Sequence, residues 1–503
     1  MHTQRPGMRL SQLVERMGAQ GEVRCVFAAG GTDPIVTGIS ADSRAVIRGD
    51  IFAALTGSAN DGTQFIGQAV AEGAVAVLVK DGTDVPQRLT VPVVVGREPR
   101  RALALMAAAL YPSQPATVVA VTGTSGKTSV ADFTRQIFAA LGHEAASLGT
   151  IGVIRSRSAV YGSLTTPDPV TLHKTLMQLT NDGVTHLAME ASSHGLDQFR
   201  LDGVRLSAGA FLNLGRDHLD YHPSVDAYLE AKLRLFRELL QPGQPAVVVA
   251  DAPFAERAKA AAAERGLQLF TVGAAGDGLR LLSAERDGFG QKLRIGYDGR
   301  EVELRLDLIG NYQASNALVA AGFALALGAP AKAVFEAMAG LKGVVGRLEV
   351  VGERNGGLAI VDYAHKPEAL IAALDAVRPF VSGRLVCVMG CGGDRDRGKR
   401  PIMGAIAAAK ADLVIVTDDN PRNEDPALIR AAILAGGGGA ANGRAEMLEI
   451  ADRGDAIRAA VAGMQPGDVV LVAGKGHEPG QIVGKITLPF SDHDAVRTAL
   501  TSP

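Results

Sequence analysis

Three apolar runs of this chain each end in a glycine-rich, polar loop, and this pattern restricts the fold more than any other. They are VVAVTGTSGKTS at 118–129, VCVMGCGGDRD at 386–396 and VLVAGKGHE at 470–478. Apolar runs that alternate with helical patterns indicate parallel strands covered by helices. In such open sheets, ligands bind at the carboxyl ends of the strands. The sequence therefore predicts an α/β protein whose sites lie at these loops.

The chain is too long for one ordinary core, because 503 residues correspond to about three domains. The helical pattern RRALALMAAALYP closes at Pro112, and a strand pattern restarts just after it. Alternation of strands and helices begins again near residue 346. We therefore expect domains at 1–112, 113–345 and 346–503, the last two with mostly parallel sheets.

Composition excludes several classes of protein. The net charge of −2 gives no basic surface for nucleic acid or an anionic membrane. The most apolar segment, 317–331, is shorter than the ~18–20 residues of a membrane span, so we expect a buried helix there. Cys25, Cys387 and Cys391 cannot form a disulfide framework, which favours a reducing compartment. The start of the chain has no apolar signal core, and AGGGGAANG at 435–443 is expected to be flexible.

The first glycine loop has the features of a phosphate-binding loop. Gly123 and Gly126 permit tight turns that aim backbone N–H groups at phosphate oxygens, next to a helix amino terminus. Lys127 can reach the outer phosphates, and the Thr128 hydroxyl can bind Mg²⁺. Val121 replaces the first glycine of the strict pattern, so a plain turn with a surface lysine remains the alternative.

A second group of residues suits Mg²⁺. Glu190 ends the apolar run HLAME, His218 follows the run AFLNL, and Lys232 lies on an amphipathic helix. Magnesium prefers oxygen ligands and completes its shell with water and phosphate. The alternatives are a solvated loop histidine and a helix lysine in a salt bridge, and spacing alone does not decide between them.

Many short motifs occur in one order along nearly the whole chain. They are VTGTSGKTS, LTTPDP, MEASSHGLDQFRLDG, RDHLDYH, AKLRLF, GNYQASN, VGRLE, DYAHKP, GCGGDRDRGKRP, DDNPRNEDP and AGKGHE. Together they resemble the Mur ligase family, and within it the branch that adds meso-diaminopimelate. The resemblance implies three domains: an N-terminal α/β substrate domain, a central P-loop ATPase-like domain and a C-terminal Rossmann-like domain that binds the amino acid.

The implied activity is an ATP-dependent amide ligation in peptidoglycan precursor synthesis. ATP would phosphorylate the D-Glu side-chain carboxylate of UDP-MurNAc-L-Ala-D-Glu, and the amine of meso-diaminopimelate would attack the acyl phosphate. A carboxylate is a poor acyl donor, and phosphorylation supplies the leaving group, so catalysis becomes positioning and charge neutralisation. We expect a cytoplasmic monomer that uses Mg²⁺ and ATP.

The resemblance also assigns residues to these ligands. For catalysis it implies Lys127, Glu190, His218 and Lys232, and for magnesium Thr128, Glu190, His218 and Lys232 as a carbamate. For ATP it implies Gly123, Thr124, Ser125, Gly126, Lys127, Thr128, Asn316, Arg347 and Asp362, with Asn311 and His365 as weaker candidates. For the UDP-sugar peptide it implies Ala41, Ser43, Ser58, Ala59, Asn60, Thr165, Thr166, Ser192, Gln198 and Arg200. For diaminopimelate it implies Arg395, Asp419, Asn420, Pro421, Arg422, Gly474 and Glu478.

The segment DLVIVTDDNPRNEDP at 412–426 bears on the choice of amino acid. We expect Pro421 to end the strand, and Asp425 with Pro426 to begin a helix. Arg422 is not needed for this turn, but it would bind the distal carboxylate of diaminopimelate.

Departures from the family pattern are few: Ser125 replaces an asparagine and Gly215 a serine. The alternatives are a lysine-adding relative, a ligase of another Mur step, a folylpolyglutamate synthase-like ligase, and a nucleotide-dependent switch that does not ligate.

Overall fold

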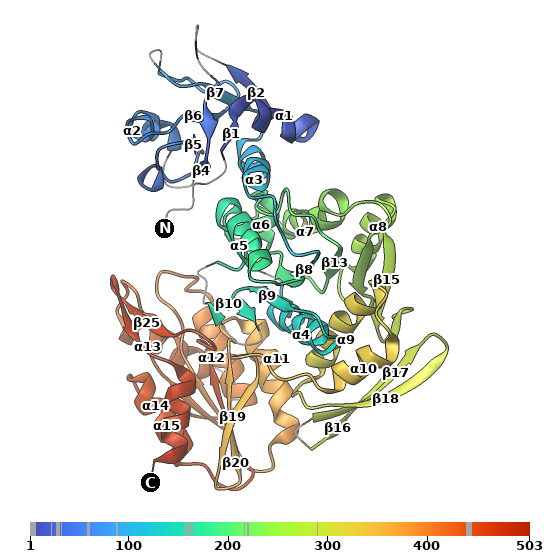
Figure 1. The fold of residues 1–503 in the computed structure, drawn as a ribbon. Coiled ribbons are helices and arrows are strands. Elements are labelled where there is room, and N and C mark those ends of the chain that lie inside the picture. The colour runs from blue at the N-terminus through green and yellow to red at the C-terminus, as the bar shows by residue number, and fades with distance from the viewer. Residues whose placement is uncertain are drawn as a thin grey trace. The chain divides into compact units, whose positions relative to one another are not determined.

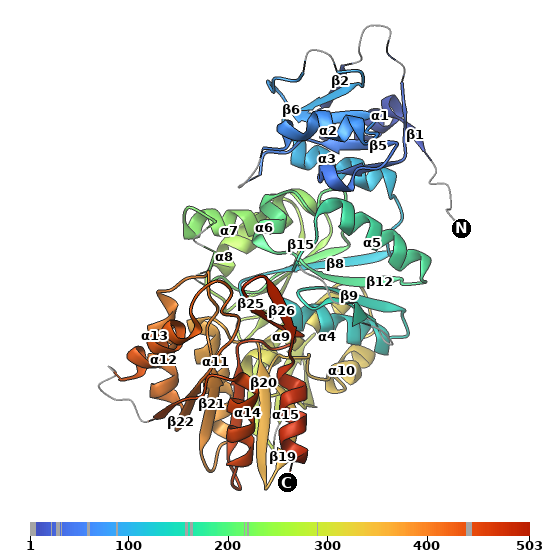
Figure 2. The same cartoon turned by 90° about the vertical axis from the view of Figure 1, so that its left-hand side faces the viewer.

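A computed structural model describes residues 7–21, 23–26, 31, 33–57, 61–86, 89–155, 159–160, 164–215, 217–218, 221–288, 290–438 and 445–502. The chain divides into two compact units (Figures 1 and 2). The first comprises Met1–Thr271 and Gly322–Pro330, and the second Val272–Ala321 and Ala331–Pro503. No helix of the described residues is long and apolar enough to cross a membrane.

The first unit begins with a five-stranded sheet of order β2-β7-β6-β5-β4. Strands β4 to β7 run parallel, and β2 is an antiparallel edge. The elements of this part are β1 (Met8–Arg9), α1 (Leu10–Gly21), β2 (Val23–Val26), β3 (Ile35–Val36), β4 (Gly38–Ser40), η1 (Ser43–Ala45), β5 (Asp50–Ala53), η2 (Gly62–Phe65), α2 (Ile66–Ala71), β6 (Ala76–Lys80), β7 (Val93–Gly96) and α3 (Pro99–Leu110). Helix α1 packs on α3, and both contribute to the core beneath the sheet.

The rest of the first unit is built on a larger sheet whose centre, β9-β12-β8-β13-β14, is parallel. Its fully buried strands carry apolar residues on both faces, as expected for a sheet covered by helices. The elements are β8 (Thr117–Thr122), α4 (Lys127–Ala140), β9 (Ala145–Gly149), β10 (Gly152–Arg155), β11 (Ala159–Val160), α5 (Pro169–Asn181), β12 (His186–Glu190), α6 (Ser193–Asp197), β13 (Ala208–Phe211), α7 (Val225–Arg234), the π-helical turn η3 (Leu235–Leu239), β14 (Pro245–Val249), α8 (Ala255–Glu264) and β15 (Gln268–Gly273).

The second unit opens with an antiparallel meander and two helices. These are β16 (Leu279–Asp287), β17 (Gly290–Tyr297), β18 (Arg300–Leu306), α9 (Asn311–Ala326), which runs into the first unit at Gly322, and α10 (Ala331–Ala339). The expectation of one buried helix over 317–331 is therefore partly wrong. The segment is buried as far as Leu325, but the helix ends at Ala326 because Gly328 takes a left-handed φ of 89° and Pro330 follows.

The last part of the second unit is a six-stranded sheet of order β19-β20-β24-β21-β22-β23, parallel except at β19. Its elements are β19 (Glu349–Arg354), β20 (Gly357–Asp362), α11 (Pro367–Val377), η4 (Arg378–Phe380), β21 (Leu385–Met389), α12 (Lys399–Lys410), β22 (Leu413–Val416), α13 (Pro426–Gly438), β23 (Glu446–Glu449), α14 (Arg453–Ala462), β24 (Val469–Ala473), β25 (Gly480–Val483), β26 (Ile486–Pro489) and α15 (Asp492–Thr501).

This sheet has a core on each face. Cys387 and Met389 of β21 face α11, α12 and α13, whereas Val386 and Val388 face α14 and α15. Figure 2 shows α14 and α15 beside β19 and β20. Cys387 and Cys391 are buried core residues, and burial raises the pKa of the Cys391 thiol to about 11.

Two local expectations for this unit are wrong. Strand β22 ends at Val416, so Pro421 lies in the loop after the strand and does not end it. The glycine run begins inside α13, which reaches Gly438. A Cβ at Gly436 would stand 1.9 Å from the Pro401 carbonyl oxygen, so this glycine allows α13 to approach α12 closely. The tail of the run, 439–443, lies outside the described residues.

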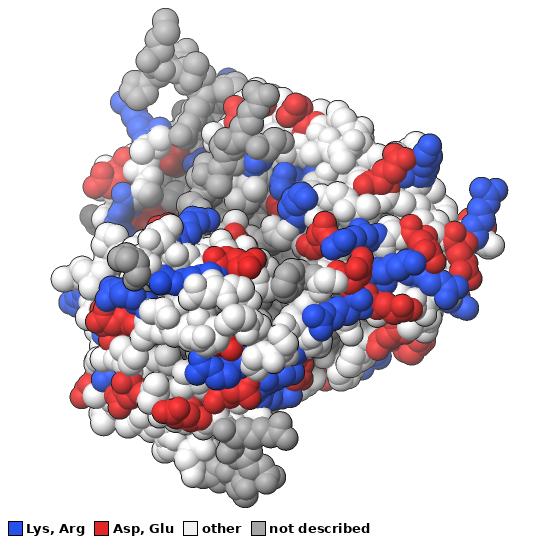
Figure 3. Space-filling view, turned by 90° about the horizontal axis from the view of Figure 1, so that it is seen from below, with Lys and Arg blue, Asp and Glu red and all other residues white. Residues whose placement is uncertain are grey.

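Acidic and basic side chains are interspersed on the face shown in Figure 3, which agrees with the small net charge of the chain.

Candidate functional site

The phosphate loop lies between β8 and α4 of the first unit. Gly123 has a φ of 155° and Gly126 a φ of 89°, and Gly126 is the residue that precedes the helix. A Cβ on Gly123 would stand 2.9 Å from the Leu212 Cβ atom, so only glycine fits beside that strand end. Lys127 Nζ donates to the carbonyls of Gly123 and Thr124 at 2.8 and 3.0 Å. The loop has the shape that the sequence predicted.

Asn213 fixes the loop, although the sequence did not single it out. Its Oδ1 accepts the N–H groups of Thr124 and Ser125 at 3.2 and 3.0 Å, and its Nδ2 donates to the Ser125 carbonyl. These two loop N–H groups therefore face Asn213. The N–H groups left for phosphate are those at the first turn of α4, where Lys127 and Thr128 begin the helix.

Glu190 lies at the carboxyl end of β12, next to β8 in the sheet, and is 1% exposed. Its Oε1 accepts the Thr150 N–H at 2.7 Å, and its Oε2 accepts the Thr150 hydroxyl at 3.2 Å. Thr128 is 8% exposed at the start of α4. A carboxylate and a hydroxyl are ligands that suit Mg²⁺, so these two residues fit the expected ion. No group of three or more His, Cys, Asp or Glu side chains that could hold a metal occurs in the described ranges.

Lys232 lies on α7 and is 1% exposed. Its Nζ donates to the Gly123 carbonyl at 2.8 Å and lies 4.3 Å from the centre of the Tyr228 ring. The Tyr228 hydroxyl is 3.2 Å from the Thr124 hydroxyl, so α7 is tied to the phosphate loop by two side chains. A carbamate on Lys232 would keep one N–H for the Gly123 carbonyl, so the surroundings of the nitrogen fit that modification.

His218 takes a left-handed φ of 51° in the loop after β13, and its side chain is 40% exposed. Its ring packs edge-on against His194, with centroids 4.6 Å apart, and its Nε2 lies 3.3 Å from Asp217 Oδ2. The histidine is thus oriented by an aromatic neighbour and a carboxylate.

The structure brings together five residues that the resemblance assigned to the sugar peptide. The Thr166 hydroxyl accepts from the Ser192 N–H and hydroxyl, both at 3.1 Å, and donates to the Glu190 carbonyl. Arg200 donates to the Thr166 carbonyl and to Gln198 Oε1, both at 2.7 Å. The Thr165 hydroxyl lies 3.0 Å from that of Thr150, which itself binds Glu190. Hydrogen bonds therefore link this group to the expected magnesium ligand.

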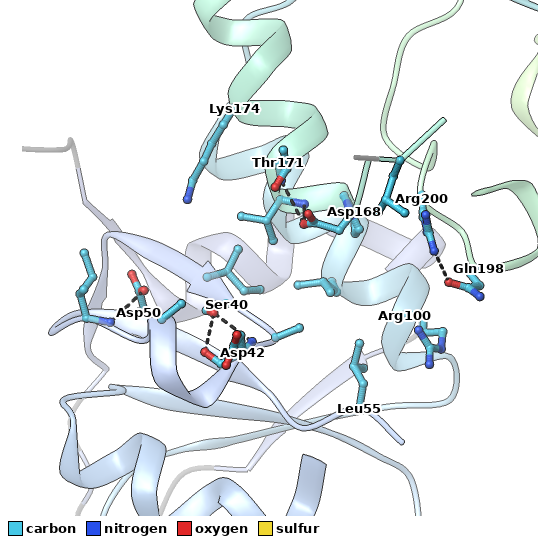
Figure 4. A pocket seen from close by; sticks show the side chains of 18 residues that line it. Ser40, Asp42, Asp50, Leu55, Arg100, Asp168, Thr171, Lys174, Gln198 and Arg200 are labelled. Carbon is cyan, nitrogen blue, oxygen red and sulfur yellow. Dashed lines mark hydrogen bonds between the residues drawn. The ribbon is translucent and has the colours of Figure 1, made fainter. Parts of the chain in front are cut away.

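A cavity of about 600 Å³ adjoins Gln198 and Arg200 in the first unit (Figure 4). Ala41, Gln198 and Arg200 line it, whereas Ser43 is buried nearby and does not. Ser58, Ala59 and Asn60 lie outside the described residues.

Six charged side chains line this cavity, three acidic and three basic. Asp42 pairs with Arg44, and Asp168 caps α5 by accepting two N–H groups. Asp50 accepts the Ile47 N–H. By contrast, Arg100 donates to the Thr56 carbonyl, Lys174 lies 5.4 Å from the Tyr111 ring centre, and Arg200 binds neutral groups. Three cations thus border the cavity, where they could bind an anionic group. The sequence did not identify Arg100 and Lys174, because their helices α3 and α5 are distant in the chain.

The remaining ATP positions lie in the second unit. Asn316 Nδ2 donates to Gln313 Oε1 at 3.0 Å, and Gln313 reaches the Arg347 carbonyl. Asp362 accepts the Leu348 N–H at 2.7 Å, and burial raises the pKa of its carboxyl to about 6 against the opposing effect of Arg347. Asn316, Arg347 and Asp362 therefore form one connected group.

The two weaker candidates differ in their surroundings. Asn311 begins α9, whereas His365 Nδ1 donates to the Tyr363 carbonyl at 2.8 Å. Burial lowers the pKa of His365 to about 3, so its ring is neutral.

The carboxyl ends of β22 and β24 carry the residues assigned to the amino acid. Asn420 Nδ2 donates to Glu478 Oε2 at 2.9 Å, and Asn420 Oδ1 accepts from Lys475 Nζ at 3.0 Å. Lys475 Nζ also lies 3.1 Å from Glu478 Oε2 and 3.5 Å from Asp419 Oδ1. Gly474 takes a φ of 124°, and a Cβ there would stand 3.3 Å from Asp419 Oδ2.

A buried ion pair lies beside this group. Arg453 and Asp492 are both fully buried and form two bonds of 2.7 and 2.8 Å. Arg453 Nη2 also donates to the Ala473 carbonyl, and it lies 3.7 Å from the place of a Cβ on Gly474. The pair is neutral as a whole and fixes the end of β24.

Arg422 has a left-handed φ of 51° and is half-buried. Its Nη1 donates to the Gly393 carbonyl at 3.0 Å, and its Nε and Nη2 atoms have no hydrogen bond to any described residue. Its main chain pairs with the β25–β26 hairpin: its N–H donates to the Ile482 carbonyl, and its carbonyl accepts the Gly484 N–H. Pro421 is buried beside it, whereas Arg395 is exposed and, among the described residues, bonds only the Asp394 carbonyl.

Family models match the chain over most of its length. The Mur ligase middle domain matches residues 121–324, the Mur ligase glutamate ligase domain matches 346–476, and the Mur ligase family catalytic domain matches 35–114. A UDP-N-acetylmuramoyl-L-alanyl-D-glutamate--2,6-diaminopimelate ligase of Bradyrhizobium diazoefficiens is 57% identical over 471 residues, which are 93% of this chain and 95% of the relative. The chain belongs to the Mur ligase family.

Solved structures agree with this membership. A structure of a UDP-N-acetylmuramoyl-L-alanyl-D-glutamate--2,6-diaminopimelate ligase matches with a TM-score of 0.70 and 31% identity, over 98% of this chain and 99% of that one. A MurF ligase of Thermotoga maritima in complex with ADP matches with a TM-score of 0.61, over 92% and 96% of the two chains. At 19% identity, this second likeness concerns the fold alone. The three-domain Mur ligase architecture predicted from the sequence is therefore confirmed.

Proposed function

We propose that the protein is an ATP-dependent ligase that joins meso-diaminopimelate to the D-Glu side-chain carboxylate of UDP-MurNAc-L-Ala-D-Glu. Relatives that share 57% and 54% of their residues with this chain over more than nine-tenths of its length carry the name of that ligase. The site residues support the same reaction, and each group of contacts has a role in it.

One observation supports meso-diaminopimelate over lysine as the incoming amino acid. It is the network of hydrogen bonds and ion pairs next to Arg422, which consists of Asp419, Asn420, Lys475 and Glu478. Two carboxylates share one ammonium there, so the network is one positive charge short. The distal ammonium of diaminopimelate supplies that charge, and its distal carboxylate binds the Nε and Nη2 edge of Arg422 in bidentate fashion. Lysine has the ammonium but not the carboxylate.

The first unit binds the UDP-sugar peptide and the phosphates of ATP in this proposal. Arg100, Lys174 and Arg200 neutralise the diphosphate of the UDP-sugar in the 600 Å³ cavity, and Thr165, Thr166 and Ser192 contact the peptide. The amino end of α4 and Lys127 hold the ATP phosphates. Asn316, Arg347 and Asp362 bind the base and ribose.

Thr128, Glu190, His218 and a carbamylated Lys232 would hold Mg²⁺, which neutralises phosphate charge when bound. The residues of the chain then contribute to catalysis by positioning the substrates. They align the D-Glu carboxylate with the terminal phosphate of ATP, and afterwards align the amine with the acyl phosphate.

The deciding experiment measures phosphate release from ATP with UDP-MurNAc-L-Ala-D-Glu and either meso-diaminopimelate or L-lysine at equal concentration, with product mass as confirmation. We expect turnover with meso-diaminopimelate. Faster turnover with L-lysine would assign the protein to the lysine-adding branch, and turnover with folate and glutamate would assign it to the folylpolyglutamate synthase-like ligases.

A Lys232→Ala variant tests ligation against a non-ligating switch. It should lose turnover, because the buried nitrogen next to the phosphate loop is removed. Lys259→Ala is the matched control, since Lys259 lies on α8 and pairs with Glu256 on the surface. Unchanged turnover in Lys232→Ala would contradict the assigned role.

A further inference from the structure

Lys475 is the most deeply buried ammonium next to the amino-acid residues, with 0% of its surface exposed. An isolated charge is costly at such a depth, and the cost is offset only by close partners. Its partners are Asn420 Oδ1 at 3.0 Å, Glu478 Oε2 at 3.1 Å and Asp419 Oδ1 at 3.5 Å. All three belong to the group that the resemblance assigned to the amino acid, whereas it assigned no ligand to Lys475.

The ammonium and a backbone N–H together determine which way the Asn420 carboxamide points. Asn420 Oδ1 accepts from Lys475 Nζ and also from the Ile482 N–H at 2.9 Å. Two donors at one position require an oxygen there, so the amide nitrogen must face Glu478. One of its hydrogens bonds Glu478 Oε2, and the second has no acceptor among the described residues.

The same ammonium determines which oxygen of Glu478 meets the ligand. Oε2 already accepts from Lys475 and Asn420. Oε1 has only the Tyr363 hydroxyl, at 3.4 Å, among the described residues. Lys475 therefore leaves one N–H donor and one carboxylate oxygen side by side, which are the partners for a carboxylate and an ammonium.

Close contacts with neighbouring residues fix the main chain around Lys475. A Cβ on Gly476 would stand 2.8 Å from the Tyr363 Cβ atom, and the Glu478 N–H donates to the Lys475 carbonyl at 3.0 Å. Lys475 therefore enters the network from a fixed backbone position.

We propose that Lys475 is a positioning residue for amino-acid recognition, which presents the Asn420 N–H and Glu478 Oε1 to the zwitterionic end of the incoming amino acid. This rests on the proposed function for the nature of that end. Lys475 does not touch the reacting atoms.

The test compares Lys475→Met, which keeps the length of the side chain and removes the ammonium, with Lys485→Met. Lys485 is exposed at the turn between β25 and β26, so it controls for losing a lysine from the same region. In Lys475→Met the KM for meso-diaminopimelate should rise about tenfold to 100-fold, the range for a lost bond to a charged group. The KM for ATP should stay within about twofold of wild type.

Two results would overturn the proposal: an amino-acid KM within about twofold of wild type, or equal rises in both KM values with a lower melting temperature. If Lys475→Met does not fold, Lys475→Met/Glu478→Gln removes the uncompensated carboxylate and is measured in its place. It is compared with Glu478→Gln alone, and equal amino-acid KM values in these two would also overturn the proposal. Wild-type turnover reports separately on the proposed function, since the same comparison can be made with whichever amino acid the wild type uses.

Discussion

Replacing Arg422 by alanine should raise the KM for meso-diaminopimelate and leave the KM for ATP nearly unchanged. The Nε and Nη2 atoms of Arg422 have no bond to other described residues, so the substitution removes two charge-assisted bonds to the ligand. Each is worth about 1.5–3 kcal/mol when buried. Arg422 is half-buried, so the sum is discounted for solvent screening to about 2–3 kcal/mol, or about 30- to 150-fold in KM.

The backbone at Arg422 does not change this expectation. Arginine and alanine both carry a Cβ, so the cost of the left-handed φ of 51° is the same in both proteins. The bond from Nη1 to the Gly393 carbonyl is lost as well, and the melting temperature reports on that loss. Steady-state kinetics with each substrate varied in turn provide the measurement.

Two further variants complete the experiment. Arg422→Lys keeps the charge without the planar fork and should give an intermediate KM. Arg458→Ala removes an exposed arginine of α14 that pairs with Asp455, and should change neither KM. Equal rises in the KM values for ATP and the amino acid in Arg422→Ala would refute the reasoning, because the arginine would then serve the turn and not recognition.

Two other predictions concern stability. Gly436→Ala should cost about 1–3 kcal/mol, because its Cβ would meet the Pro401 carbonyl oxygen, whereas Gly438→Ala, where nothing lies within 4 Å, should be neutral; melting temperatures that fall equally would contradict this. Burial lowers the pKa of His173 from 6.5 to about 4, so the unfolded chain takes up a proton that the folded chain excludes. The contribution of His173 to the free energy of unfolding should therefore be fully present above pH 6.5. It should fall on acidification by on the order of 3 kcal/mol near pH 4. His173→Gln should flatten this part of the urea-unfolding profile, and an unchanged slope would contradict the assignment.

The fold was predictable from the sequence where the signal is local. The runs that form β8, β12, β20, β21, β22 and β24 are apolar and end in glycine or polar loops, so their class and order follow from hydrophobicity and turn residues. The β16–β18 meander was missed because its strands are largely polar on one face and lack such loops. The Gly436 region was misinterpreted because close approach of two helices is a tertiary property.

Only those site residues that lie within recognisable motifs could be predicted from the sequence. The order of the motifs along the chain identified Glu190, Lys232 and Arg422. The residues that position the site do so through contacts between segments distant in sequence. Asn213 meets the phosphate loop from 88 residues away, and Lys475 meets Asn420 from 55 residues away. A lysine between two glycines directly after an apolar strand is the sequence signal that could have identified Lys475.

The hairpin of β25 and β26 has a consequence for engineering. Two main-chain bonds join Arg422 to Ile482 and Gly484, and the Ile482 N–H binds Asn420 Oδ1. The loop that contains Asn420 and Arg422 is thus structurally coupled to the hairpin, although 62 residues separate Asn420 from Ile482 in the sequence. Grafting residues 417–426 from a relative of different preference should fail unless residues 474–489 are transferred with them. Selectivity for the amino acid is therefore a property of two segments that must change together.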